Sequence, residues 1–150
     1  MDAVTYPNKD VAVFINENLI PIRVRFDAIP LSKDFTVKWT PTHVMLDLKG
    51  KEHSRTLGFV PPEEMIPLLL LGMAKTCFDL DDLDQALVDL DQVIQTYPKS
   101  HSAPEAVYLQ GVSRYLGTHD ASHLKQLHAK LRDEYPQSVW AQRSLPYRLL

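Results

Sequence analysis

The sequence predicts an α/β part followed by an all-α part, and the spacing of its apolar residues indicates the division. Before Pro61, apolar residues follow the two-residue period of strands in two short stretches. After Pro61 they follow the period of about 3.6 residues that is typical of helices with one buried face. We therefore expect an α/β domain over residues 1–62 and a helical domain over residues 63–150.

Composition favours a soluble globular protein. The chain has 150 residues, of which 45% are hydrophobic and 23% charged, enough for one ordinary domain or two small units. A net charge of −3 gives no reason to expect a nucleic-acid partner. The longest apolar run, Met65–Ala74, is far shorter than the roughly 20 residues of a membrane span, so we expect no membrane partner. No secretory leader opens the sequence, which favours a cytoplasmic location.

The first elements follow from capping and periodicity. Asn8 is a good N-cap for a helix over Lys9–Asn18, which has apolar residues on one face. Leu19–Phe26 alternates apolar and polar residues and predicts a strand, near whose start Pro21 is tolerable. A short helical turn is expected around Ser32–Thr36.

A hairpin follows, with a proline at its entrance. Proline cannot donate to a sheet ladder, so Pro41 belongs at the mouth of the strand. A cis X-Pro bond costs only about 0.5–1 kcal/mol, so the Thr40–Pro41 bond can hold that isomer. The predicted strands are His43–Leu48 and Glu52–Leu57, joined by a turn at Lys49 and Gly50.

The order and spacing of several short matches resemble the thioredoxin-like family. They are Met1-Asp2-Ala3-Val4-Thr5-Tyr6, Asp10-Val11, Arg25-Phe26-Asp27, Thr40-Pro41-Thr42, Leu46-Asp47, Gly50, Gly58-Phe59 and Pro61-Pro62-Glu63-Glu64. The resemblance implies an incomplete thioredoxin-like domain, because the family's first strand and its C-x-x-C would lie before Met1. It also implies a cis-proline loop that binds the backbone of a polypeptide, with Trp39, Thr40 and Pro41 as the peptide-binding residues and Trp39 as the anchor.

Five helices are expected in the second part. They run from Pro61 to about Phe78, over the apolar stripe from Leu83 to Tyr97, from Pro104 to Leu116, from the Asp120 cap to Tyr135, and from Trp140 to Leu145. A kink or early break is expected at Pro67, and Gly117 is expected to end the third helix as a C-cap.

An internal repeat organises these helices. Tyr97-Pro98-Lys99-Ser100 recurs as Tyr135-Pro136-Gln137-Ser138. The first unit has Ala74, Ala86, Leu90 and Pro98 at the spacing of the small, large and proline positions of tetratricopeptide repeats. The helical part therefore resembles a short, divergent tetratricopeptide-like array.

Three groups of residues are candidates for chemical sites. Cys77 is the single cysteine, and its place late in an apolar helix favours a buried small hydrophobe over a nucleophile. His119, His123 and His128 invite a metal hypothesis, against which we weigh a solvated helical face. The acidic run Asp79, Asp81, Asp82, Asp84, Asp89 and Asp91 lacks the pattern of a calcium loop and also favours a solvated face. We nominate no catalytic residue, metal site or cofactor.

The leading functional hypothesis is a non-catalytic thioredoxin-like module that binds polypeptide partners. The joining of the two resemblances implies a chaperone-associated or redox-related role. The alternative is the C-terminal portion of a thiol–disulfide oxidoreductase whose C-x-x-C lies upstream of Met1. Self-association into a homo-oligomer, through the strand Leu19–Phe26 or the hairpin edge, is a third hypothesis.

Overall fold

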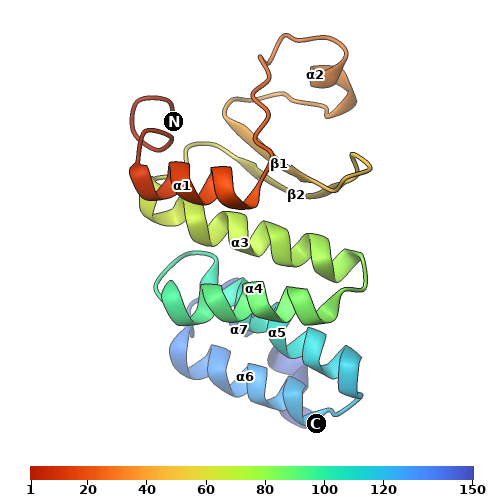
Figure 1. Ribbon diagram of the computed structural model, residues 1–150. Coiled ribbons are helices and arrows are strands. Elements are labelled where there is room, and N and C mark those ends of the chain that lie inside the picture. The colour runs from red at the N-terminus through yellow and green to blue at the C-terminus, as the bar shows by residue number, and fades with distance from the viewer. The chain divides into compact units, whose positions relative to one another are not determined.

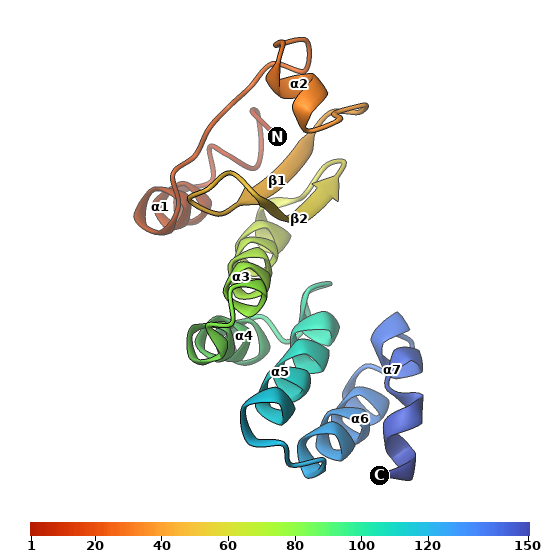
Figure 2. The ribbon, with the colours of Figure 1, turned by 90° about the vertical axis from the view of Figure 1, so that its right-hand side faces the viewer.

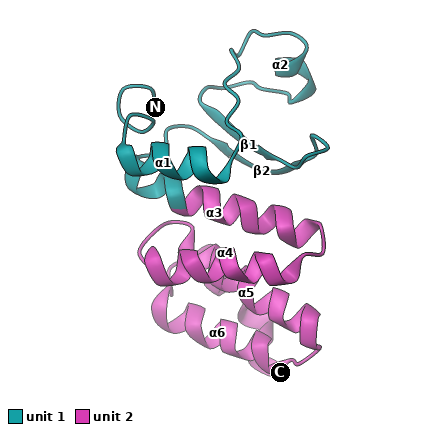
Figure 3. Ribbon diagram, viewed as in Figure 1, with its two compact units in different colours: residues 1–66 teal, residues 67–150 magenta.

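The computed structural model describes residues 1–150 and divides into two compact units, Met1–Ile66 and Pro67–Leu150 (Figure 3). The chain is mainly helical, and one two-stranded antiparallel sheet lies in the first unit. The prediction of an α/β part followed by an α part is confirmed at this level. None of the helices has the length and apolarity needed to cross a bilayer.

Helix α1 (Lys9–Asn18) opens the first unit with the bounds that the sequence predicts. The Asn8 side chain accepts hydrogen bonds from the backbone N–H groups of Asp10 and Val11, which satisfies donors that the first helical turn leaves free. Val11 is the buried residue of this helix. The turn before α1 is held by Thr5, whose buried hydroxyl donates to the Val60 carbonyl at 2.7 Å.

The predicted hairpin is confirmed. Strands β1 (Thr42–Leu46) and β2 (Glu52–Leu57) pair antiparallel, with Thr42 opposite Leu57 and Val44 opposite Arg55 (Figure 1). The connecting turn needs a left-handed residue, and Gly50 supplies it with φ +80°.

The strand predicted over Leu19–Phe26 is wrong. This stretch is a drawn-out, irregular chain between α1 and α2 (Leu31–Asp34), as Figure 2 shows. A strand requires a neighbour on its ladder, and the only sheet in the chain contains β1 and β2. The alternating pattern is present, but no other segment pairs with it. The short helical turn expected next is confirmed by α2, one residue earlier than predicted at its start.

The second unit is built from helices. Their bounds are α3 (Pro62–Asp79), which begins in the first unit, α4 (Leu83–Thr96), α5 (Ala103–Thr118), α6 (Ser122–Glu134), α7 (Val139–Arg143) and the 3-10 helix η1 (Leu145–Leu149). The break expected at Pro67 does not occur. The Pro67 side chain is fully buried, and this burial offsets the hydrogen bond that proline cannot donate.

Successive helices of the second unit pack against each other. α5 lies between α4 and α6, and η1 packs against α6 (Figure 2). An ion pair between Lys75 and Glu105 links α3 to α5. The core is formed by small and branched apolar side chains, namely Ala86, Leu90, Val93, Ala103, Ala106, Val107, Leu124, Leu127, Leu131 and Ala141.

The sequence repeat has a structural counterpart. Tyr97 ends α4 at φ −126°, ψ 49°, and Tyr135 ends α6 at φ −134°, ψ 48°. In both turns the backbone N–H of the serine three residues later donates to the tyrosine carbonyl at 3.0 Å. The Tyr135 hydroxyl also donates to the Pro98 carbonyl at 2.8 Å, which joins the two equivalent turns.

The predicted C-cap of α5 is wrong. The helix continues through Gly117 to Thr118, and His119 takes the left-handed conformation with φ 59°. Its backbone N–H donates to the Tyr115 carbonyl at 2.7 Å, which satisfies a carbonyl in the last turn. The fourth helix begins near the predicted Asp120, whose carboxylate accepts the Ser122 N–H.

Candidate functional site

The loop that precedes β1 is anchored from both sides. The Arg55 side chain on β2 donates to the Phe35 carbonyl at 2.6 Å and forms an ion pair with Glu52. The Val37 N–H donates to the Ser32 carbonyl at 2.9 Å, so the loop is also tied back to α2. These contacts fix the backbone immediately before Trp39.

Pro41 joins this loop to the hairpin. The Thr40–Pro41 peptide bond is cis, as is the Ile29–Pro30 bond. The Pro41 carbonyl accepts the Gly58 N–H at 2.8 Å, and the Thr42 hydroxyl donates to the Trp39 carbonyl at 2.7 Å. The backbone around the proline is therefore held by Thr42 of β1 and by Gly58, the residue that follows β2.

A half-open pocket lies beside this loop. It has a volume of about 200 Å³ and is lined by Phe26, Val37, Lys38, Trp39 and Thr40. The two aromatic residues are largely open to solvent, with 69% of Trp39 and 67% of Phe26 exposed. Large apolar side chains with this exposure are available to a ligand. Lys38 adds a cationic group that forms no ion pair.

The site residues predicted from the sequence include part of this pocket. Trp39 and Thr40 line it, whereas Pro41 is half-buried and does not. Phe26, Val37 and Lys38 were missed as site residues. Val37 and Lys38 adjoin Trp39 in the sequence, whereas the approach of Phe26 to Trp39 depends on the path of the chain through α2, which local spacing does not specify.

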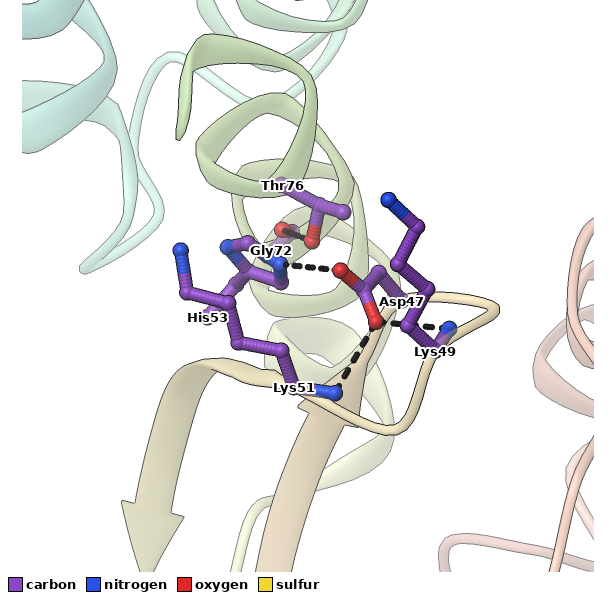
Figure 4. A network of polar contacts seen from close by, with 6 residues as sticks. All are labelled: Asp47, Lys49, Lys51, His53, Gly72 and Thr76. Carbon is purple, nitrogen blue, oxygen red and sulfur yellow. Dashed lines mark hydrogen bonds and ion pairs between the residues drawn. The ribbon is translucent and has the colours of Figure 1, made fainter. Parts of the chain in front are cut away.

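A second polar feature, separate from the pocket, is a network of hydrogen bonds in the turn between β1 and β2. The Asp47 carboxylate accepts the N–H groups of Lys49 at 2.8 Å and Lys51 at 2.9 Å, and it contacts His53 Nε2 at 3.2 Å (Figure 4). These hydrogen bonds, the Lys51 N–H first, hold the pKa of Asp47 below its usual value. The network stabilises the turn, and the same view shows the Thr76 hydroxyl bonded within α3 to the Gly72 carbonyl.

Cys77 has the surroundings of an unreactive thiol. It is half-buried, and burial, followed by the nearby carboxylates of Asp89 and Asp82, raises the pKa of its thiol. A raised pKa lowers the population of thiolate, which is the nucleophilic form. The prediction of a buried position is correct only in part, since the side chain keeps some exposure.

The three histidines lie in different environments, and His123, in α6, is half-buried. His119 ends α5, while His128 is buried and its Nδ1 lies 2.9 Å from the Ser144 hydroxyl. That hydroxyl donates to the Ala141 carbonyl, so His128 Nδ1 carries the proton of the shared hydrogen bond. The solvated face expected for these residues is wrong for His128. No three histidine, cysteine or acidic side chains gather closely enough to hold a metal ion.

The residues of the acidic run also lie in different environments. Asp82 caps α4 by accepting the Gln85 N–H, and Asp91 pairs with Arg114 at 3.6 Å. Asp89 is only 4% exposed, so the solvated face expected for the run is wrong at this position. One of its carboxylate oxygens accepts from Gln85 Nε2 at 3.1 Å, and the other has no hydrogen-bond partner.

Comparisons of the chain with protein-family models, with curated proteins and with solved structures give no match.

Proposed function

We propose that the chain is a non-catalytic polypeptide-binding module, in which a thioredoxin-like α/β part precedes tetratricopeptide-like helices. The observation that carries the proposal is the pocket between Phe26 and Trp39. Two exposed aromatic side chains flank it, and hydrogen bonds to both neighbouring elements hold the backbone beneath them. Aromatic side chains on a rigid support are typical anchors for polypeptide partners.

The proposed ligand is an unfolded or extended chain. A pocket of about 200 Å³ accommodates one side chain but is smaller than a typical site for a drug-sized molecule. Exposed backbone beside a pocket allows main-chain hydrogen bonds to supply affinity while the pocket selects the side chain. Binding of this kind needs no catalytic group.

A direct test measures binding of an unfolded protein by fluorescence anisotropy. The probe is fluorescein-labelled lactalbumin, reduced and carboxymethylated so that it cannot fold, and native lactalbumin is the folded comparison. We expect Trp39→Ala to weaken binding of the unfolded probe by about tenfold or more, as loss of an aromatic anchor does. Leu48→Ala is the matched control, because Leu48 is 99% exposed and lies outside the pocket. Equal affinities of the parent and Trp39→Ala proteins would refute the proposal.

A further inference from the structure

Residues 20–26, here called the open segment, expose an unbroken row of apolar side chains. Every second residue is large and apolar, with exposed fractions of 82% for Ile20, 78% for Ile22, 43% for Val24 and 67% for Phe26. In an extended chain, side chains at every second position share one face. Four such residues in succession form an apolar row, of which Val24 is the most covered member and the other three are largely exposed.

The backbone of the open segment is equally free. The nearest main-chain hydrogen bonds are Leu19 N–H to Ile15 and Ala28 N–H to the Arg25 carbonyl. Between them, no N–H group of the segment donates to another backbone group. An extended chain with unmet donors and acceptors is a template onto which another strand can add.

The apolar row leads into the pocket described above. Phe26 is its last member and also lines the pocket with Trp39. A chain laid along the row therefore reaches the pocket with its own end side chain. Phe26 is thus common to the row and the pocket, and both lie within the first unit.

Charge indicates which strand fits. The side chains between the apolar ones include Arg23 and Arg25, which are 82% and 84% exposed, and the pocket adds Lys38. Their ion pairs with Asp2 and Asp27 are at the surface, where such pairs contribute little to stability and are easily exchanged. In the antiparallel register that pairs Ile20 with Phe26, a second copy would place Arg23 opposite Arg23. Directly opposed like charges destabilise a strand pair.

We propose that the open segment binds an extended polypeptide by strand addition, and that this partner alternates large apolar side chains with acidic ones. The apolar side chains cover the row from Ile20 to Phe26, and an end side chain enters the pocket beside Trp39. The acidic side chains face Arg23 and Arg25. This inference rests on the proposed polypeptide-binding function and specifies the chemistry and backbone geometry of the ligand.

The test uses the peptide FEVEVEF-amide with fluorescein on its N-terminal amine, and the peptide FKVKVKF-amide, labelled at the same amine, is the charge-reversed control. We expect the acidic peptide to bind at least about tenfold more tightly than the basic one. The double variant Ile22→Thr with Val24→Thr keeps strand-forming residues but removes two members of the row, and it should weaken binding by about tenfold. Val88→Thr on α4 is the matched control, because Val88 is 59% exposed and remote in sequence.

Amide hydrogen exchange then separates strand addition from apolar docking alone. Bound peptide should slow exchange at every second amide between Ile22 and Phe26, and a peptide N-methylated along one edge should bind more weakly. Unchanged exchange in the segment, or no binding of the acidic peptide, would overturn the inference. A dimer in sedimentation that the Ile22 and Val24 substitutions abolish would also overturn it, by making a second copy the occupant.

The lactalbumin probe distinguishes this failure from failure of the proposed function. If Trp39→Ala weakens binding of unfolded lactalbumin while the double variant binds the acidic peptide as the parent protein does, the polypeptide-binding function stands and strand addition falls. If Trp39→Ala leaves both probes unaffected, the proposed function falls with it.

Discussion

At the scale of single residues, Asp89 is a buried carboxylate of the helical unit whose hydrogen bonding is incomplete. Its carboxylate is buried, and one oxygen lacks a hydrogen bond. Burial is the main cause that raises the pKa of Asp89, and the negative charge of Asp82 raises it further against the hydrogen bond from Gln85. A raised carboxyl pKa means that the folded state disfavours the charged form.

Asp89→Asn is therefore expected to stabilise the protein at pH 7. The folded pKa of Asp89 lies above the unfolded value of 3.8, so the parent protein loses stability as pH rises from the unfolded value through the folded one. The neutral variant avoids this loss and should gain about 1 kcal/mol at pH 7, with the gain vanishing below pH 4. Urea unfolding of the parent and the variant at pH 7 and below pH 4 measures the difference in their free energies of unfolding.

Asp84→Asn provides the control. Asp84 is exposed in the first turn of α4, where its negative charge interacts favourably with the helix dipole. It should be neutral or slightly destabilising at pH 7. An Asp89→Asn protein less stable than the parent at pH 7 would show that the buried charge has a compensating partner.

Cys77 should react slowly in the folded protein. Its thiol pKa is raised by burial and by two carboxylates, so little thiolate is present at pH 8. We expect alkylation by iodoacetamide at pH 8 to be slower than for the urea-unfolded chain, as measured by mass spectrometry over time. Faster alkylation of the folded protein would identify Cys77 as an activated thiol.

At the scale of elements, Gly111 sets how closely α5 and α6 approach. A Cβ atom at this position would lie 2.5 Å from Leu127 Cβ, far inside van der Waals contact. Because Leu127 Cβ is fixed to its backbone, the two helices would have to separate. Glycine is required here by packing, and φ plays no part.

Gly111→Ala should destabilise the protein by about 1–3 kcal/mol, since overpacking outweighs the gain in helix propensity of about 1 kcal/mol. Gly117→Ala, in the same helix, is the control, because its Cβ would meet only Leu83 Cδ1 at 4.0 Å. That change should be neutral or stabilising. The two variants are compared by thermal unfolding, monitored by circular dichroism. Similar unfolding midpoints for Gly111→Ala and Gly117→Ala would contradict the packing argument.

Element by element, the sequence predicts helices better than strands. The α1 and α4 starts are fixed by the local caps Asn8 and Asp82, so their positions follow from the residues themselves. The alternation over Leu19–Phe26 indicates an extended chain but cannot supply a ladder partner. Local sequence likewise indicates Trp39 as a site residue, because it lies beside Pro41. It does not indicate Phe26, which is distant in sequence and reaches the pocket only through the fold.

At the scale of the whole molecule, the helical unit is a series of packed helices that closes on itself at one end. α5 packs on α4 and α6, and the last helices close the end of this series. The closing contacts centre on Tyr108 of α5, whose ring centroid lies 5.1 Å from that of Trp140 and whose hydroxyl lies 2.9 Å from that of Tyr147. Arg143 lies over the Trp140 ring at 4.5 Å. The repeat was visible in the sequence, but this aromatic closure was not, because Tyr108 is far from Trp140 along the chain.

Trp140→Ala should therefore destabilise the end of the series more than the rest of the chain. Loss of the aromatic contact and of its packing is expected to cost about 2 kcal/mol. In an array stabilised by neighbouring contacts, that loss spreads from the site of damage. Amide exchange should accelerate most in α5, α6 and α7, and least in β1 and β2. Trp39→Ala is the matched control, because its exposed side chain contributes little to stability. An equal acceleration at every amide would instead show that the chain unfolds as a single cooperative unit.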